Sequence, residues 1–176
     1  MPTSFLMTNT EPTVVAPVAA TAPFDDLQFA DGLRAIPGVE SLHARDIPGI
    51  RARVEHVAIG PSGVWVIDAH DAPGPVVRRD RRLFVGAQDR SDLLAAIKVP
   101  VDAVAAALGD LRLPISRALC FTGRGWQPQH APFMLHGVWI GPPKPLFSLV
   151  AQPGALLPRD ITHAAQLLDG LLPVAG

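Results

Sequence analysis

The chain has a single cysteine, Cys120, among its 176 residues, so no disulfide can form within it. The neighbours of Cys120 are apolar, which indicates a buried strand position more than a nucleophile. The N-terminus lacks a basic region followed by an apolar core, and its apolar stretch 14–22 is interrupted by Pro17 and too short to cross a bilayer. We therefore expect a cytoplasmic protein with no membrane partner.

Several common functional signatures are also missing. The chain contains no Gly-x-Gly-x-x-Gly, no Walker-type loop, no Cys-x-x-Cys and no Gly-x-Ser-x-Gly. Dinucleotide binding, zinc ribbons and serine hydrolases therefore have no support. His130 and His136 flank an apolar strand, but no Cys or carboxylate lies at ligand spacing, which makes them poor zinc ligands.

Length and composition indicate one globular domain. With 48% hydrophobic residues the chain can bury a sizeable core, and 176 residues argue against two domains. Residues 1–23 are rich in Thr, Pro, Ala and Val without a period, which predicts a disordered leader. Residues 24–176 are expected to form the single folded domain.

Hydrophobic periodicity and turn residues predict a mixed α/β fold. Helices are expected at 24–36, 91–108 and 160–172, with Pro100 dividing the second. Strands are expected at 39–44, 51–59, 64–70, 75–79, 82–86, 115–121, 133–140 and 146–150. This order suits an α/β sandwich in which a central β-hairpin is flanked by helices.

The central hairpin carries two carboxylates. Residues 51–59 and 64–70 are rich in β-branched and aromatic residues, and Gly60-Pro-Ser-Gly63 is a strong turn signal. A four-residue turn places Ile59 opposite Val64 and, further along, Glu55 opposite Asp68. Opposed like charges cost roughly 0.2–1 kcal/mol. A divalent cation, a shared proton or a guanidinium would relieve them, and Arg53 and His70 fall on the same face. A solvated face with splayed carboxylates is the ordinary alternative.

The run Glu55-His-Val-Ala-Ile-Gly-Pro-Ser-Gly-Val-Trp-Val-Ile-Asp-Ala-His70 resembles the nuclease-related domain (NERD) family. That family typically shows Ile-Asp-His, a hydrophobic strand, Gly-Pro-x-Gly-Val-Phe-Val-Ile and then Asp/Glu-x-Lys. The resemblance extends, with weaker motifs, over about residues 39–173. It implies a restriction-endonuclease-like PD-(D/E)XK fold with catalytic residues Glu55, Asp68 and His70. Glu55 and Asp68 would then bind Mg²⁺ or Mn²⁺.

Departures from the family pattern place catalysis in doubt. Glu55 replaces the first Asp, and His70 stands where the family has a lysine, so a shorter, mostly neutral imidazole takes the place of a fixed charge. The usual helix Glu is missing, and Pro100 occupies the position of the usual Gln. Lys98, on the helix face nearest the sheet, could be a displaced replacement for the lysine, or it could equally point to solvent.

A local basic cluster accompanies this motif, although the net charge is only −1. Together with Arg53, it could hold a phosphate backbone, and a strand edge kept soluble by charge is the alternative. The cluster consists of Arg78, Arg79, Arg81 and Arg82. Two hypotheses follow: a metal-dependent nuclease acting on DNA, and a NERD-like fold that has lost catalysis and binds nucleic acid or a protein.

Overall fold

The computed structural model describes residues 26–123, 125–126 and 131–176. The predicted leader, residues 1–23, and His130 lie outside the described residues. Within these residues, no helix combines the length and the apolar character needed to cross a membrane.

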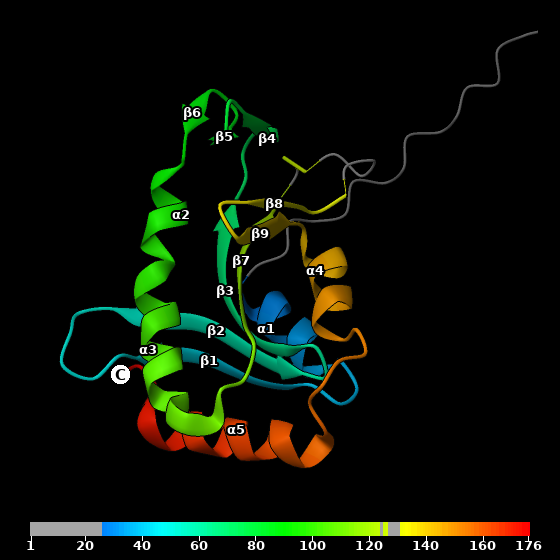
Figure 1. The fold of residues 1–176 in the computed structure, drawn as a ribbon. Coiled ribbons are helices and arrows are strands. Elements are labelled where there is room, and N and C mark those ends of the chain that lie inside the picture. The colour runs from blue at the N-terminus through cyan, green and yellow to red at the C-terminus, as the bar shows by residue number, and fades with distance from the viewer. Residues whose placement is uncertain (1–25, 124, 127–130) are drawn as a thin grey trace, which may run out of the picture.

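A mixed sheet of six strands forms the centre of the fold (Figure 1). The strands β3 and β7 are parallel, as are β7 and β9, and all other neighbours are antiparallel. In spatial order the strands are β1 (Glu40–Asp46), β2 (Arg53–Gly60), β3 (Gly63–Asp71), β7 (Ile115–Thr122), β9 (Val138–Gly141) and β8 (Phe133–Leu135).

The hairpin of β2 and β3 has the register expected from its turn. Ile59 pairs with Val64, and the ladder continues to His56 opposite Ile67. One further step places Glu55 across from Asp68. Because side chains alternate along a strand, these two acids point to the same face as Val57 and Val66.

Helices cover both faces of the sheet (Figure 1). On one face, α1 (Asp26–Arg34) and α4 (Pro143–Val150) pack against Ala58, Trp65 and Cys120. On the other, α3 (Lys98–Leu108) and α5 (Pro158–Leu171) pack against Val57 and Val66. A short 3₁₀ turn, Gly109–Leu111, follows α3. Cys120 is fully buried, and burial raises the pKa of its thiol, which agrees with a packing role.

Pro100 divides the second predicted helix, as expected. The helix α2 (Asp92–Ala96) ends before Ile97, and α3 begins at Lys98. In an uninterrupted helix the residue at position 100 would donate its N–H to the carbonyl of Ala96. Proline has no N–H, and its ring crowds that carbonyl, so the break falls one turn before it.

A small antiparallel sheet lies beyond the start of α2, at the top of Figure 1. It consists of β4 (Val76–Arg79), β5 (Arg82–Val85) and the short β6 (Gln88–Asp89). Leu83 and Val85 pack with Phe121 and Trp126 in a second core cluster. The first two strands match the prediction, whereas the two-residue β6 was not expected.

Two predicted strands are wrong. Residues 133–140 form the hairpin of β8 and β9, because His136 and Gly137 have φ of 50° and 75° and make a two-residue turn. Residues 146–150 belong to α4 instead of an edge strand. Prolines are tolerated in the first turn of a helix, where the N–H groups have no intrahelical acceptor, and Leu146 and Val150 bury one side of α4.

Two imidazoles meet between β1 and β2. Nδ1 of His43 lies 2.9 Å from Nδ1 of His56, so one ring donates and the other accepts, and Nε2 of His43 lies 3.0 Å from Oγ of Ser41. His56 is buried on the face opposite Glu55, where it has a hydrogen-bonding role in the core. Burial, followed by the nearby His56, Arg34 and Arg45, lowers the pKa of His43 from 6.5 to about 4.

This lowered pKa predicts a loss of stability in mild acid. The unfolded chain binds the His43 proton more readily between pH 6.5 and 4, so stability is full above pH 6.5 and declines as pH falls toward 4. The decline should reach about 1–2 kcal/mol at the acid end, less than the full pKa difference implies, because solvent screens the half-buried ring. Urea unfolding at several pH values should show a shallower pH dependence for His43→Gln. The control His163→Gln, at an exposed position, should retain the wild-type slope. Equal slopes in all three proteins would contradict the prediction.

Candidate functional site

The two predicted acids line one hollow of about 310 Å³ beneath the junction of α2 and α3, here called the acid hollow. The strands contribute Arg53, Glu55 and Asp68, and the helices contribute Ala96, Val99 and Pro100. The helix side of the acid hollow is therefore apolar. The proline that divides the helix also forms part of the wall facing the acids.

Each carboxylate already has a partner from its own strand. Nε of Arg53 donates to Oε1 of Glu55 at 2.7 Å, and Nε2 of His70 lies 3.0 Å from Oδ2 of Asp68. Both partners are two residues from their acid, so strand alternation places them on its face. The Glu55 and Asp68 side chains remain 30% and 25% exposed, so solvent still reaches them. The like charges are thus relieved by a guanidinium and an imidazole.

The acid hollow does not present a preassembled metal site. In the part of the chain that the structure describes, no three His, Cys, Asp or Glu side chains are grouped so as to hold a metal ion. Mg²⁺ sites often use only one or two carboxylates, with water and phosphate oxygens completing the shell. Glu55 and Asp68 fit that minimal set in kind, but Arg53 and His70 each compete with an ion for one oxygen of these carboxylates.

Lys98 does not supply the missing lysine of the family motif. Its ammonium group pairs with Asp102, one turn further along α3, and its side chain is 68% exposed. Lys98 is not among the residues that line the acid hollow. The basic group that contacts Asp68 is therefore the imidazole of His70, two residues further along the same strand.

The surroundings of His70 include groups that sequence reasoning did not select. β3 and β7 are parallel, and His70 pairs in register with Phe121, whose ring centroid lies 5.9 Å from that of His70. Oγ1 of Thr122 donates to the carbonyl of His70 at 3.3 Å, and Asp71 pairs with Thr122. Ligands often bind at the carboxyl ends of parallel strands. The sequence signal that could have indicated these groups is the order strand, helix, strand over residues 64–121, which predicts that the two strands are parallel and end side by side.

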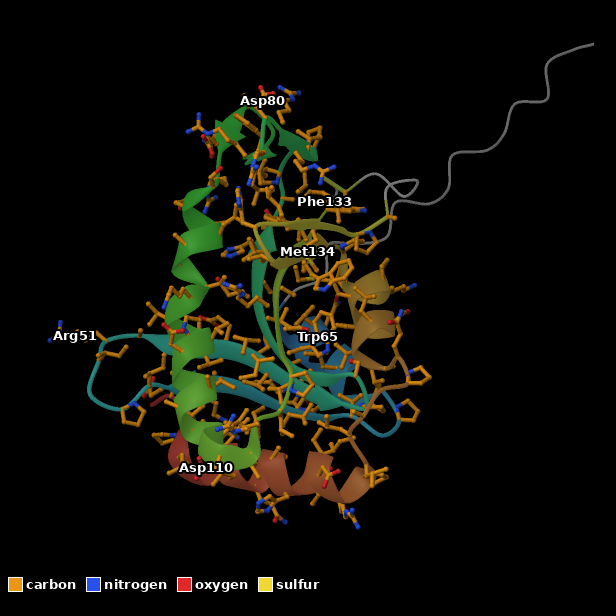
Figure 2. The ribbon with its side chains drawn as sticks, viewed as in Figure 1. Arg51, Trp65, Asp80, Asp110, Phe133 and Met134 are labelled. Atoms are coloured by element: carbon orange, nitrogen blue, oxygen red, sulfur yellow. The ribbon has the colours of Figure 1, made fainter. Side chains whose placement is uncertain are left out.

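The predicted basic residues divide into two places. The turn between β4 and β5 is surrounded by four arginines, here called the arginine hairpin: Arg78, Arg79, Arg81 and Arg82. Figure 2 shows Asp80, in this turn, near the end of α2 that lies away from β2. Arg53 is not part of this group, because it pairs with Glu55 at the acid hollow.

The arginine hairpin is held against the β8–β9 turn. Nε2 of His136 donates to the carbonyl of Arg81 at 2.9 Å, and Nη1 of Arg78 donates to that of Met134 at 3.4 Å. The guanidinium of Arg78 also lies 5.6 Å from the centroid of the Phe133 ring. Between the two turns is a hollow of about 360 Å³ lined in part by Arg78, Arg81 and His136.

Most of the arginine hairpin retains uncompensated charge. Arg82 pairs with Asp89 at 2.5 Å, and Arg79 lies over the Phe84 ring at 5.9 Å. Arg78, Arg79 and Arg81 form no ion pair with any carboxylate of residues 26–123, 125–126 and 131–176. Three exposed guanidinium groups are therefore available to an anion.

Comparison of the chain with protein-family models, with curated proteins and with solved structures finds no match. The functional conclusion therefore depends on the geometry of the acid hollow and of the arginine hairpin.

Proposed function

We propose that this protein is a NERD-like, nuclease-related module that has lost catalysis and binds the phosphate backbone of nucleic acid, with DNA as the first candidate. The observation that carries the proposal is the division of charge. Each acid has a hydrogen-bond partner on its own strand, while three arginines of the arginine hairpin pair with no carboxylate of the described residues.

The order of elements supports a restriction-endonuclease-like core. Helix α1 is followed by the antiparallel meander β1–β3, the divided helix α2–α3 and then β7, which lies parallel to β3. This is the arrangement expected from the family resemblance. Glu55 and Asp68 lie on β2 and β3, which supports the assignment of these two acids to the catalytic positions of that family.

Loss of catalysis follows from what surrounds the two acids. A nuclease needs free carboxylate oxygens for its metal and a group that activates water. Here Arg53 holds Glu55, His70 holds Asp68, and Lys98 is committed to Asp102. Each of these contacts is modest, because the side chains are partly exposed. The first two compete with a metal for the acids, and the third leaves Lys98 away from the position of a water-activating group.

Binding to a phosphate backbone follows from the arginine hairpin. Guanidinium groups match phosphate oxygens in a bidentate manner, and three lie on one short hairpin fixed by the β8–β9 turn. The net charge of −1 means that attraction must come from this local patch. Affinity should therefore be moderate, independent of base sequence and sensitive to salt.

The binding prediction compares two triple variants. Replacing Arg78, Arg79 and Arg81 by Gln should weaken binding of a fluorescent DNA duplex strongly, and reduce the slope of log K against log salt by about 2–3. The matched control, Arg34→Gln with Arg51→Gln and Arg112→Gln, removes the same charge from other exposed sites. It should bind nearly as the wild type does. Fluorescence anisotropy at several salt concentrations provides the measurement.

Equal losses in the two triple variants would mean that overall charge, and not the arginine hairpin, governs binding. Absence of binding by the wild-type protein at low salt would exclude nucleic acid and leave a protein as the partner of this module.

An active Mg²⁺- or Mn²⁺-dependent nuclease is the second candidate, favoured by the fact that Glu55 and Asp68 line one hollow. A bound ion would supply an activated water and polarise the scissile phosphate. For this, the ion would have to compete with Arg53 for Glu55, and His70 would have to turn from Asp68 in order to orient the water or take its proton.

Metal titration separates the two candidates. We expect no calorimetric heat from millimolar Mn²⁺, no change in Tm, and no nicking of plasmid DNA, because both acids are already paired. Asp68→Asn provides the matched control for any signal. Mn²⁺ binding and plasmid nicking that both disappear in Asp68→Asn would establish the nuclease and overturn the loss of catalysis.

A further inference from the structure

Another hollow, separate from the acid hollow and from the arginine hairpin, lies between α4 and the β8–β9 hairpin. Its volume is about 510 Å³, and we call it the proline groove. Its wall includes the half-buried Trp139 indole, two proline rings, an aliphatic side chain and one ammonium group, contributed by Pro132, Trp139, Lys144, Pro145 and Leu149. A groove lined by an indole and proline rings suits an extended apolar peptide that contains proline.

Lys144 gives this groove a specific electrostatic character. The protein has two lysines, and Lys98 pairs with Asp102. Lys144 is exposed at the start of α4 and has no ion pair with any carboxylate of the described residues. An occupant with one negative charge among apolar residues would complement both parts of the proline groove.

We propose that residues 11–23 of this same chain occupy the proline groove. The segment reads Glu11-Pro-Thr-Val-Val-Ala-Pro-Val-Ala-Ala-Thr-Ala-Pro23. It contains three prolines separated by small and β-branched apolar residues, which favours the polyproline II conformation that aromatic grooves bind. Glu11 is the only charged side chain before Asp25, and its carboxylate would give Lys144 an ion-pair partner.

The path of the chain makes this contact available. Helix α1 begins at Asp26, and the ring of Phe29 lies 5.1 Å from the ring of Phe147 on α4, the helix that forms one wall of the proline groove. Only two residues separate the segment 11–23 from α1, so the chain tethers its end near the helix that contacts α4. At about 3.1 Å per residue in polyproline II, its thirteen residues extend roughly 40 Å, several times the length of α4.

A spin-label experiment on the full chain tests the proposal. The variant Thr13→Cys carries a nitroxide, and Cys120 does not compete for the label because it is fully buried. The indole N–H signal of Trp139 should lose most of its intensity through paramagnetic broadening and regain it when the nitroxide is reduced. The methyl signals of Ile50, on the exposed loop before β2, should keep theirs.

A charge exchange identifies the contact within the labelled protein. Glu11→Lys should weaken the broadening at Trp139, Lys144→Glu should do the same, and the double variant should restore it. Broadening that is equal at Trp139 and Ile50 would overturn the proposal. So would broadening of an unlabelled, isotope-enriched chain mixed with labelled protein, because a second copy would then be the occupant. Loss of DNA binding in the arginine variants would leave this result unaffected.

Discussion

The antiparallel register of β2 against β3 determines where the important side chains of this protein point. A slip of one residue would turn Val57 and Val66 out of the core and rotate Glu55 and Asp68 into the opposite layer. The tight turn between Gly60 and Gly63 fixes that register. The hydrophobic core and the acid hollow are therefore two consequences of the same pairing, and neither can be altered without the other.

Sequence reasoning predicted this hairpin well because its signals are local. The turn residues, the β-branched strands and the periodic faces of α3 and α5 all depend on near neighbours. The errors occurred where tertiary context decides. His136 adopts a positive φ that sequence alone does not require, so β8 and β9 were read as one strand. Leu146 to Val150 resembles a strand until Pro142 and Pro143 are recognised as a helix start.

The acid hollow was predicted only in part, for a different physical reason. Alternation along a strand established that Arg53, Glu55, Asp68 and His70 share a face. It could not establish how each acid would be neutralised, because that depends on side-chain rotamers and on the helix above. Lys98 illustrates the point, since its side chain is largely exposed and pairs with Asp102 along α3. Pro100 could be predicted to break the helix because it lacks an N–H, but its place in the wall of the acid hollow depends on where the broken helix packs.

One contact described above couples two distant parts of the chain. The imidazole of His136 donates to the carbonyl of Arg81 across 55 residues, joining the tip of one hairpin to the tip of another. The direction in which the arginines face thus depends on the residues of both hairpin tips, and neither segment determines it alone. Transplanting residues 76–85 to another scaffold would carry the charges but lose their orientation. Insertions near residues 136–137 would change the direction in which the arginines face while leaving every arginine in place.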